Sequence, residues 1–132
     1  MRTGVLFVSP HREDAALLSR MLGSLPVRLE HVADLRHARA TIHAAAYQVI
    51  LTEATLPDGT WREVLDMVRN VVPAPAVIVT DVSADAHFWA EALNLGAYDL
   101  IAQPFATAEV RRILSYACSR SSDKSRTAAT AV

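Results

Sequence analysis

Short runs of apolar residues alternate along this chain with longer stretches in which apolar side chains recur every three or four positions. The clearest runs are residues 5–8, 49–51 and 76–79, and two weaker ones are residues 27–32 and 100–102. Apolar side chains at successive positions are typical of parallel strands that are buried on both faces. The pattern therefore predicts five strands, the three clearest of them fully buried.

Five helical stretches follow the strands in turn. We expect the first to stop at Gly23 and the fourth, over residues 84–95, to stop at Gly96, because glycine commonly follows a helix C-terminus. Asp34 suits the N-cap of the second helix, and the third follows a Leu-Pro-Asp-Gly turn at residues 56–59. The fifth carries apolar residues at helical spacing, namely Val110, Ile113, Leu114 and Ala117.

A strand followed by a helix thus occurs five times, with short connections. Right-handed crossovers place such helices on both faces of a single parallel sheet, so the predicted fold is a three-layer α/β sandwich. The segment 120–132 is rich in small and polar residues, and we interpret it as a flexible C-terminal tail or a linker. The predicted domain accordingly covers residues 1–119.

The bulk properties exclude several classes of function. The 132 residues suit one domain, and the formal net charge of −1 gives no reason to expect nucleic-acid binding by this domain. No apolar run approaches the roughly 18–20 residues that cross a bilayer, and residues 5–8 are too short a run for a secretory signal. The single cysteine, Cys118, cannot form an internal disulfide. We expect a cytoplasmic protein without a membrane segment.

Polar residues follow the predicted strands at one edge of the sheet. In open α/β sheets ligands bind beyond the carboxyl ends of the strands, so the candidate site consists of the residues at or directly after the ends of strands one, three, four and five. We call this set the rim, and it comprises Ser9, Pro10, His11, Thr52, Glu53, Thr80, Asp81, Gln103 and Pro104.

Other titratable residues give no metal-binding pattern. None of the five histidines stands three or four residues from another, which favours scattered surface positions over a metal site. Only His11 belongs to the rim. Glu13 and Asp14 fall where the first helix should begin, and there the helix dipole favours acidic side chains. We therefore predict no metal site from these residues, and weak cation binding by the acidic loop residues stays an open alternative.

Four segments, in this order and at this spacing, resemble the response-regulator receiver family of bacterial two-component signalling. They are residues 5–8, residues 49–51 with the Leu-Pro-Asp-Gly turn, residues 76–80, and the stretch 96–105, which reads Gly-Ala-Tyr-Asp-Leu-Ile-Ala-Gln-Pro-Phe. The resemblance covers about residues 3–119. It implies a flavodoxin-like (βα)5 fold with strand order 2-1-3-4-5 and a cis peptide bond before Pro104.

The resemblance also implies a set of phosphorylation residues, most of which are replaced in this chain. The two acids that hold Mg²⁺ after strand one correspond to Ser9 and Pro10, and neither is a carboxylate, so we expect the Mg²⁺ site to be lost and no cofactor to remain. The phosphoryl-accepting aspartate corresponds to Glu53, and the lysine before the strand-five proline corresponds to Gln103. Only the strand-four hydroxyl is kept, as Thr80.

These replacements predict a pseudo-receiver, a non-enzymatic domain that acts by contact with a sensor kinase, an output domain or another regulator. Phosphoryl transfer depends on positioning and on neutralising charge, and the metal ligands and the lysine are both missing. Two alternatives stay open. One is a working phosphoacceptor at Glu53 or a nearby aspartate. The other is a small-ligand-binding module that uses the rim, although residues 9–11 offer no glycine for close approach to a phosphate.

Glu53 itself has two interpretations. Its carboxylate lies one methylene further from the backbone than that of an aspartate, and it carries about one charge where a phosphate carries about 1.5–2. It is either a fixed, weak mimic of the phosphorylated state that accepts hydrogen bonds from Thr80 and Gln103, or a drifted side chain that points to solvent.

In the family, partners and second copies dock on the face made by helix four, strand five and helix five. The corresponding interface candidates here are Trp89, Tyr98, Leu100, Val110 and Tyr116. Leu100 stands where the family has a switch aromatic. Phe88 and Trp89 are adjacent on one helix and cannot both face the core, so we expect one of them to be exposed. This face is our candidate for a homodimer contact.

Overall fold

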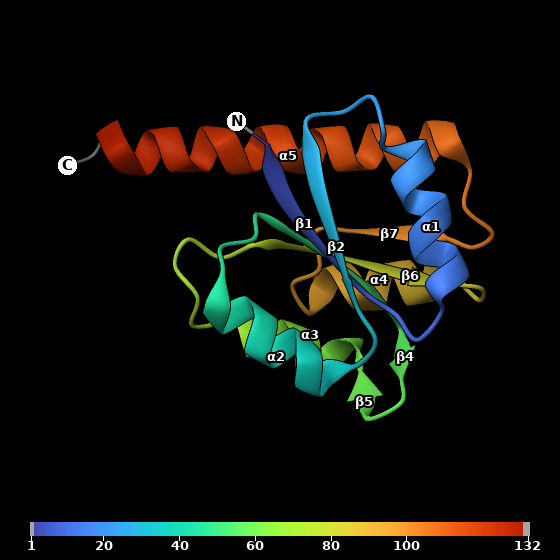
Figure 1. Cartoon of the computed structure of the whole chain (residues 1–132). Coiled ribbons are helices and arrows are strands. Elements are labelled where there is room, and N and C mark those ends of the chain that lie inside the picture. Colours follow the sequence, from blue (N-terminus) through green and yellow to red (C-terminus); the bar gives the residue numbers. More distant parts are fainter. Residues whose placement is uncertain (1, 131–132) are drawn as a thin grey trace.

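A five-stranded parallel sheet runs through the middle of the molecule (Figure 1). This computed structural model describes the backbone of residues 2–130 and the side chains of residues 2–120. The spatial order of the strands is β2-β1-β3-β6-β7, which confirms the predicted order 2-1-3-4-5, because β6 and β7 are the fourth and fifth strands of this sheet. The strands are β1 (Thr3–Val8), β2 (Val27–Val32), β3 (Val49–Glu53), β6 (Ala76–Asp81) and β7 (Asp99–Ala102).

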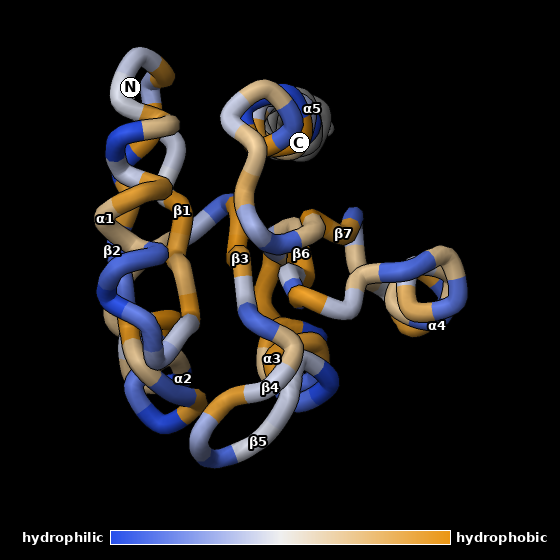
Figure 2. The backbone as a smooth tube through the Cα atoms, turned by 90° about the vertical axis from the view of Figure 1, so that its right-hand side faces the viewer, coloured by the Kyte–Doolittle hydropathy of each residue, from blue (hydrophilic) through white to orange (hydrophobic). Residues whose placement is uncertain are grey.

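Helices cover both faces of the sheet and make the three predicted layers (Figures 1 and 2). On one face lie α1 (Arg12–Met21) and α5 (Thr107–Thr130). On the other face lie α2 (Leu35–Ala44), α3 (Trp61–Val68) and α4 (Ala86–Asn94). In Figure 2 the strands appear as largely hydrophobic segments between the helices.

The core is divided between the two faces by the alternation of side chains along each strand. In β1, Val5 and Phe7 pack with residues of α1 and α5, whereas Leu6 and Val8 pack with residues of α2 and α3. All four side chains are fully buried, as expected of a strand with helices on both sides. The same alternation determines which layer each rim residue faces.

The helix ends follow local signals in the sequence. Asp34 accepts the backbone N–H of His37 at 2.9 Å and is the N-cap of α2, as predicted. Thr60 and Glu63 form a capping box at the start of α3, in which each side chain accepts a backbone N–H of the first turn. The fourth helix ends close to Gly96, whose φ of 112° lies in a region that glycine adopts without strain.

The Leu-Pro-Asp-Gly turn forms the tip of a small antiparallel hairpin that the hydrophobic pattern does not predict. Its strands are β4 (Thr55–Leu56) and β5 (Gly59–Thr60). The carboxylate of Asp58 accepts the backbone N–H groups of Leu35 at 2.9 Å and Arg36 at 3.1 Å. The turn is therefore tied to the start of α2, and Asp58 satisfies donors that the helix itself cannot.

The last helix continues beyond residue 119. α5 continues to Thr130, through most of the segment 120–132 for which we expected a flexible tail or linker. Neither glycine nor proline occurs from residue 105 to residue 132, so the local sequence lacks the usual signals that end a helix. The domain limit at residue 119 stays a prediction, and residues 131–132 lie outside the described part.

Among the described residues, no helix is both long and apolar enough to span a membrane.

Aromatic rings connect the third and fourth helices. Trp61 is 6% exposed, and its ring lies 5.7 Å from that of Phe88, measured between centroids. Trp89, the next residue, is 47% exposed, and its indole Nε1–H donates to Asp99 at 3.3 Å. The prediction that one of the two adjacent aromatics is exposed is therefore confirmed.

Candidate functional site

Glu53, the last residue of β3, lies at the centre of the rim. It lies two residues after Leu51 and four after Val49, both of which pack with α1 and α5, so its side chain leaves the sheet on that same face. In the register of the sheet its partner on β6 is Thr80, whose side chain shares the face. Glu53 is only 8% exposed, which excludes the interpretation that it points to solvent.

Two side chains from the loop after β1 hold the Glu53 carboxylate. The Ser9 hydroxyl donates a short hydrogen bond to Oε2, and His11 Nδ1 lies 2.9 Å from the same oxygen. The backbone N–H of His11 donates to Ser9 Oγ at 3.0 Å, so the three groups form one closed network. We had expected Thr80 and Gln103 to donate hydrogen bonds to Glu53. That expectation was wrong, because its partners are Ser9 and His11.

The loop that carries Ser9 and His11 is itself fixed by β2. Ser9 N–H donates to the carbonyl of Val32 at 2.9 Å, and His31 Nε2 lies 2.7 Å from the carbonyl oxygen of Ser9. His11 occupies the N-cap position of α1, and its backbone is extended there. The sequence pattern placed His31 among scattered surface histidines, whereas it is half-buried and supports the rim.

The charges at the rim act on one another. A hydrogen bond to Glu53 and the charge of that carboxylate raise the pKa of His11 above its ordinary value, although burial acts in the opposite direction. Asp14 lies 3.8 Å from His11 Nδ1. Burial, followed by the charge of Glu53, raises the pKa of the Asp14 carboxyl. His11 and Glu53 of the rim thus interact with Asp14 beside them, and these interactions raise the pKa of both His11 and Asp14.

Thr80 and Gln103 each have one buried side-chain atom that lacks a hydrogen-bond partner among the described residues. Thr80 is fully buried, and neither its Oγ1 nor the Nε2 of Gln103 has a hydrogen-bond partner among the described residues. Because Gln103 is linked to Pro104 by a cis peptide bond, the prediction for that bond is confirmed. Buried polar groups are usually hydrogen-bonded, so these two atoms are exceptions among the described residues.

The rim residues do not fit Mg²⁺. This ion prefers oxygen ligands in a near-octahedral arrangement, whereas the positions after β1 are a serine and an exposed proline, Pro10. The imidazole of His11 occupies the side of Glu53 that faces the loop. His11, Asp14 and Glu53 nevertheless bring three donor atoms within 4.8 Å of one another. Sequence reasoning missed this group because it took Asp14 for a first-turn helix acid, which it also is.

The interface candidates divide into exposed and buried residues. Trp89 on α4 and Tyr116 on α5 are 47% and 64% exposed. Leu100 on β7 is buried, and Val110 on α5 is fully buried, so neither presents a free surface, and these two candidates are corrected. Leu100 and Val110 face the core, where apolar neighbours cover their side chains. Tyr98 is half-buried, and the guanidinium of Arg120 lies over its ring at 5.3 Å.

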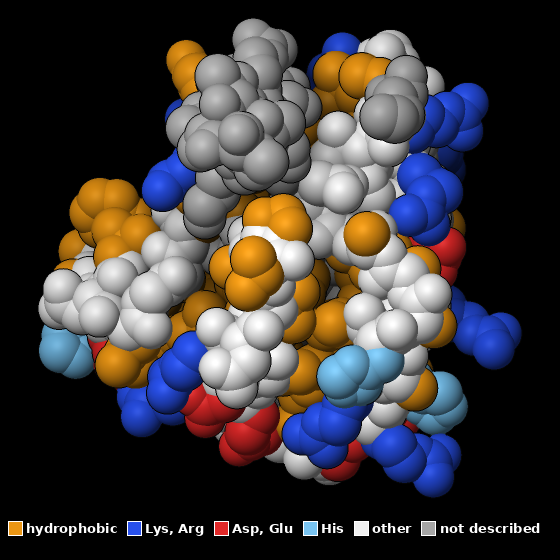
Figure 3. All heavy atoms as spheres, turned by 90° about the vertical axis from the view of Figure 1, so that its left-hand side faces the viewer, with side chains coloured by type: hydrophobic (Ala, Val, Ile, Leu, Met, Phe, Trp, Pro, Cys, Tyr) orange, Lys and Arg blue, Asp and Glu red, His pale blue; other side chains and the backbone are white. Residues whose placement is uncertain are grey.

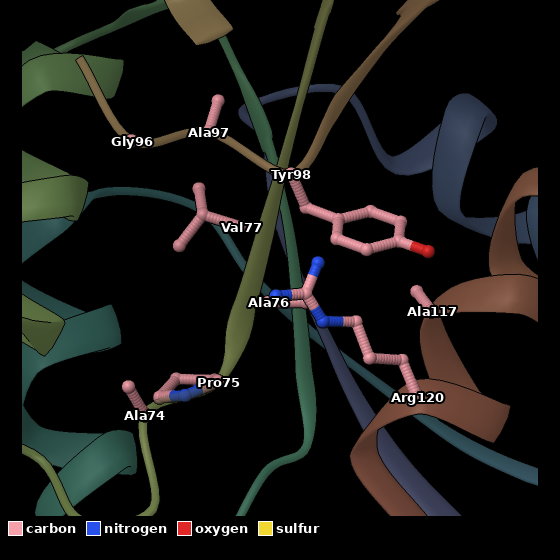
Figure 4. A pocket seen from close by; sticks show the side chains of 9 residues that line it. All are labelled: Ala74, Pro75, Ala76, Val77, Gly96, Ala97, Tyr98, Ala117 and Arg120. Carbon is pink, nitrogen blue, oxygen red and sulfur yellow. The ribbon is translucent and has the colours of Figure 1, made fainter. Parts of the chain in front are cut away.

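A cavity of about 320 Å³ lies at the opposite ends of the strands from the rim (Figure 4). Figure 4 shows the Tyr98 ring and the Arg120 side chain beside each other on one side of it, with Pro75 at the other. The lining comes from the start of β6, the loop before β7 and the inner face of α5. The cavity does not involve the rim, and it lends no support to a small-ligand site there.

The surface opposite the rim carries charges of both signs. On the face seen in Figure 3, the described acidic and basic side chains are mixed, and hydrophobic side chains reach the surface between them. Direct nucleic-acid binding typically uses a clustered basic surface. The side chains in this view are not arranged in that way.

The parallel sheet in the order 2-1-3-4-5, with a carboxylate at the end of its third strand, matches the fold of receiver domains. The chain belongs to the response regulator receiver domain family, whose model matches residues 5–115. Receiver domains of this family are the input modules of two-component response regulators. Among curated protein sequences there is no significant match.

Solved structures share the fold closely at low sequence identity. The signal receiver domain of a protein described as a Luxo repressor, from Vibrio parahaemolyticus, superimposes with a TM-score of 0.89 at 21% identity, over 96% of this chain and 98% of that one. The chemotaxis response regulator CheY4 of Vibrio cholerae gives a TM-score of 0.80 at 21% identity, over 89% and 99%. The beryllofluoride-activated NtrC4 receiver domain, determined as a dimer, gives 0.81 at 23% identity, over 89% and 98%. At these identities the likeness extends to the fold alone.

Proposed function

We propose that this receiver domain transmits a signal through protein contacts and without being phosphorylated. The observation that carries the proposal is the state of Glu53, which is buried and hydrogen-bonded by Ser9 and His11. The carboxylate that would have to attack a phosphodonor already has two partners from its own chain. On this proposal the domain is a cytoplasmic, non-enzymatic module.

The physical requirements of phosphoryl transfer support the same conclusion. The transition state spreads negative charge over the transferred group, and catalysis relies on cations to neutralise it. Ser9 and Pro10 replace the acids that would hold Mg²⁺, and Gln103, a neutral amide, replaces the lysine. The His11 imidazole, whose pKa is raised by Glu53, already contacts that carboxylate, with Nδ1 2.9 Å from Oε2.

The closed network also supports the proposal that the domain acts without a switch. Glu53 links the end of β3 to the loop after β1, so the two segments are held in one arrangement. Its single charge makes it a weak imitation of a phosphorylated aspartate, which carries about 1.5–2 charges at neutral pH. The proposed domain is therefore fixed in one conformation, and regulation comes from the partner.

The partner surface in this proposal is the face of α4, β7 and α5. Trp89 and Tyr116 are its exposed large side chains, and a shallow depression of about 250 Å³ lies beside Trp89 and reaches Glu109. Exposed aromatic residues are enriched in protein interfaces. A second copy of the chain is the simplest occupant, and the NtrC4 receiver was determined as a dimer.

The phosphorylation part is tested by intact mass after incubation with acetyl phosphate, with and without Mg²⁺. We expect no mass gain for the wild type. A variant that carries Ser9→Asp, Pro10→Asp, Glu53→Asp and Gln103→Lys restores the family's residue types, and it should gain one phosphoryl group only when Mg²⁺ is present. That gain shows that the fold itself permits the reaction.

A Mg²⁺-dependent phosphoryl group on the wild type would overturn the proposal. If Glu53→Ala abolished it, the phosphoacceptor alternative at Glu53 would be correct. If it persisted in Glu53→Ala, peptide mapping would assign it to a nearby aspartate such as Asp14 or Asp81. Both results would identify a working receiver with unusual ligands.

The contact surface is tested by sedimentation velocity over a range of protein concentrations. We expect wild-type self-association that Trp89→Ser weakens. Val72→Ser is the matched control, because Val72 is 91% exposed and belongs to the loop before β6, away from this face. Equal behaviour of the two variants, or a monomer at all concentrations, would remove the second copy as the partner and leave a different protein to be sought.

A further inference from the structure

Two rim side chains, His11 and Glu53, and the neighbouring Asp14 place donor atoms at separations that suit a metal ion. His11 Nδ1 lies 2.9 Å from Glu53 Oε2 and 3.8 Å from Asp14 Oδ2, and all three donor atoms lie within 4.8 Å of one another. In a tetrahedral site with bonds of about 2.0–2.2 Å, neighbouring donor atoms stand roughly 3.3 Å apart. The two measured separations bracket this value, so small side-chain rotations bring the donors to coordination distance.

The donor set selects the kind of metal. An imidazole nitrogen with two carboxylates suits ions of the borderline class, and Zn²⁺ is commonly held by such nitrogen and oxygen ligands. Mg²⁺ prefers all-oxygen coordination, and the serine and proline after β1 remove the carboxylates that the family offers it. The donor set of His11, Asp14 and Glu53 therefore suits a borderline cation better than a hard one.

An independent observation points to an absent ligand at the same place. Thr80 is fully buried, and its hydroxyl has no partner among the described residues. It is the register partner of Glu53, and side chains of paired residues leave the sheet on the same face. A water molecule bound to a metal at Glu53 would supply the polar group that this hydroxyl lacks.

We propose that the rim binds one Zn²⁺ ion through His11, Asp14 and Glu53, with a remaining position open to water. The site draws on two elements, because His11 and Asp14 belong to the start of α1 and Glu53 to the end of β3. A bound ion would therefore join the helix to the strand. The inference does not depend on whether the domain is phosphorylated.

The chain contains a matched control for this site. His37 and Asp34, at the start of α2, repeat the same residue types three positions apart, with His37 Nδ1 2.6 Å from Asp34 Oδ1. The His37 side chain is 56% exposed, the same value as for His11. Among residues 2–120, no third histidine, cysteine, aspartate or glutamate places a donor atom within 4.8 Å of the His37–Asp34 pair. A lone histidine–aspartate pair should bind Zn²⁺ only weakly.

The test is a Zn²⁺ titration of the full chain after chelator treatment and dialysis. Zn²⁺ is added in competition with a chromophoric chelator, and native mass spectrometry gives the number of ions per chain. We expect one Zn²⁺ per wild-type chain and an affinity at least about tenfold lower in His11→Ala. The variant His37→Ala should bind as the wild type does.

Further variants keep the result independent of folding. Asp14→Asn changes a partly exposed side chain and should also weaken binding, whereas the more buried Glu53→Gln is compared only after its thermal unfolding has been shown to be cooperative. Equal binding by wild type and His11→Ala would overturn the proposal and direct attention to Cys118 as the ligand. Displacement of Zn²⁺ by a large excess of Mg²⁺ would also overturn it. No phosphodonor is present, so failure here leaves the proposed function intact.

Discussion

The charge of Glu53 acts directly on His11, and we expect removal of that charge to lower the pKa of the imidazole. In metal-free protein the hydrogen bond and the charge of Glu53 hold the pKa of His11 above its ordinary value of 6.5. Glu53→Gln keeps the shape of the side chain and removes its charge. An NMR titration of the His11 ring should then show a lower pKa, while Glu63→Gln, at the start of α3, should leave it unchanged. An unaltered His11 titration in Glu53→Gln would contradict the pairing.

The same pair makes stability depend on pH. Because the folded pKa of His11 is raised, its contribution is fully present below pH 6.5 while Glu53 is ionised. The contribution is lost as the pH rises through the folded pKa. The stability advantage of wild type over Glu53→Gln, measured by urea unfolding, should therefore shrink as the pH rises from 6.5. Solvent screening of the exposed imidazole keeps the effect small, and an advantage that grows over this range would refute it.

Gly59, at the tip of the β4–β5 hairpin, fits because it has no side chain. A Cβ at this position would collide with the side chains of Leu35 and Glu63. We expect Gly59→Ala to lower the free energy of unfolding by about 1–3 kcal/mol, as overpacking does. The control is Gly23→Ala, whose new Cβ would lie 3.5 Å from the nearest atom and should change stability by less than about 0.5 kcal/mol. Equal losses in both variants would exclude the steric explanation.

At the residue scale, the sequence predicted the location of the site better than its contacts. Strand ends predicted that Ser9, Glu53, Thr80 and Gln103 would meet, because the carboxyl ends of parallel strands lie at one edge. Which of these side chains touch depends on their rotamers. The contact between His11 and Glu53 also joins residues that are 42 positions apart in the sequence. Neither is encoded in local periodicity, so the network around Glu53 had to come from the structure.

At the scale of single elements, the capping box of α3 is a local device whose cost can be measured. Thr60→Ala removes the side chain that accepts the backbone N–H of the first turn. Loss of such a cap costs about 1 kcal/mol, and we expect that decrease in the free energy of unfolding. Thr55→Ala is the control, because Thr55 pairs with Thr60 across the hairpin but caps no helix. A cost that is as large in Thr55→Ala would assign the effect to the hairpin.

Element types were easier to predict than element ends. The buried strands have a clear pattern, and Asp34 is a reliable start signal for α2. The β4–β5 hairpin is too short to produce a pattern of its own, and its role emerges only through Asp58, which contacts α2 from 23 positions away. We interpreted residues 120–132 as a tail or linker because they are small and polar. An exposed helix, however, can be polar on most of its surface.

At the scale of the whole molecule, α5 is attached to the sheet by a fully buried row of side chains. Leu114 belongs to the same core cluster as Val5, Leu51 and Ile78. We expect Leu114→Ala to cost about 2–5 kcal/mol of unfolding free energy, since it leaves a cavity between layers. Tyr116→Ala, on the same helix but 64% exposed, should change stability by less than about 0.5 kcal/mol. Similar effects of the two variants would show that α5 is only loosely attached.

The layer arrangement was fully predictable because topology leaves few choices. Five strand–helix repeats with short connections allow essentially one right-handed doubly covered sheet. The strand order came from the family resemblance, since periodicity does not specify which strands are neighbours. The interface residues were predicted less well, because Leu100 and Val110 are core residues, and whether an apolar side chain on an edge strand or helix faces inward depends on its rotation about the axis.

The two tryptophans differ in solvent exposure, so intrinsic fluorescence can report on two parts of the protein without an added label. Trp61 is 6% exposed, whereas Trp89 is 47% exposed. A dissolved quencher such as iodide reaches the outer indole by collision and the inner one only after α3 and α4 separate. Native emission should therefore contain one accessible and one protected component of different colour, and Trp89→Phe should remove the accessible one. Local loosening around α4 and loss of the whole fold can then be distinguished in the same fluorescence trace.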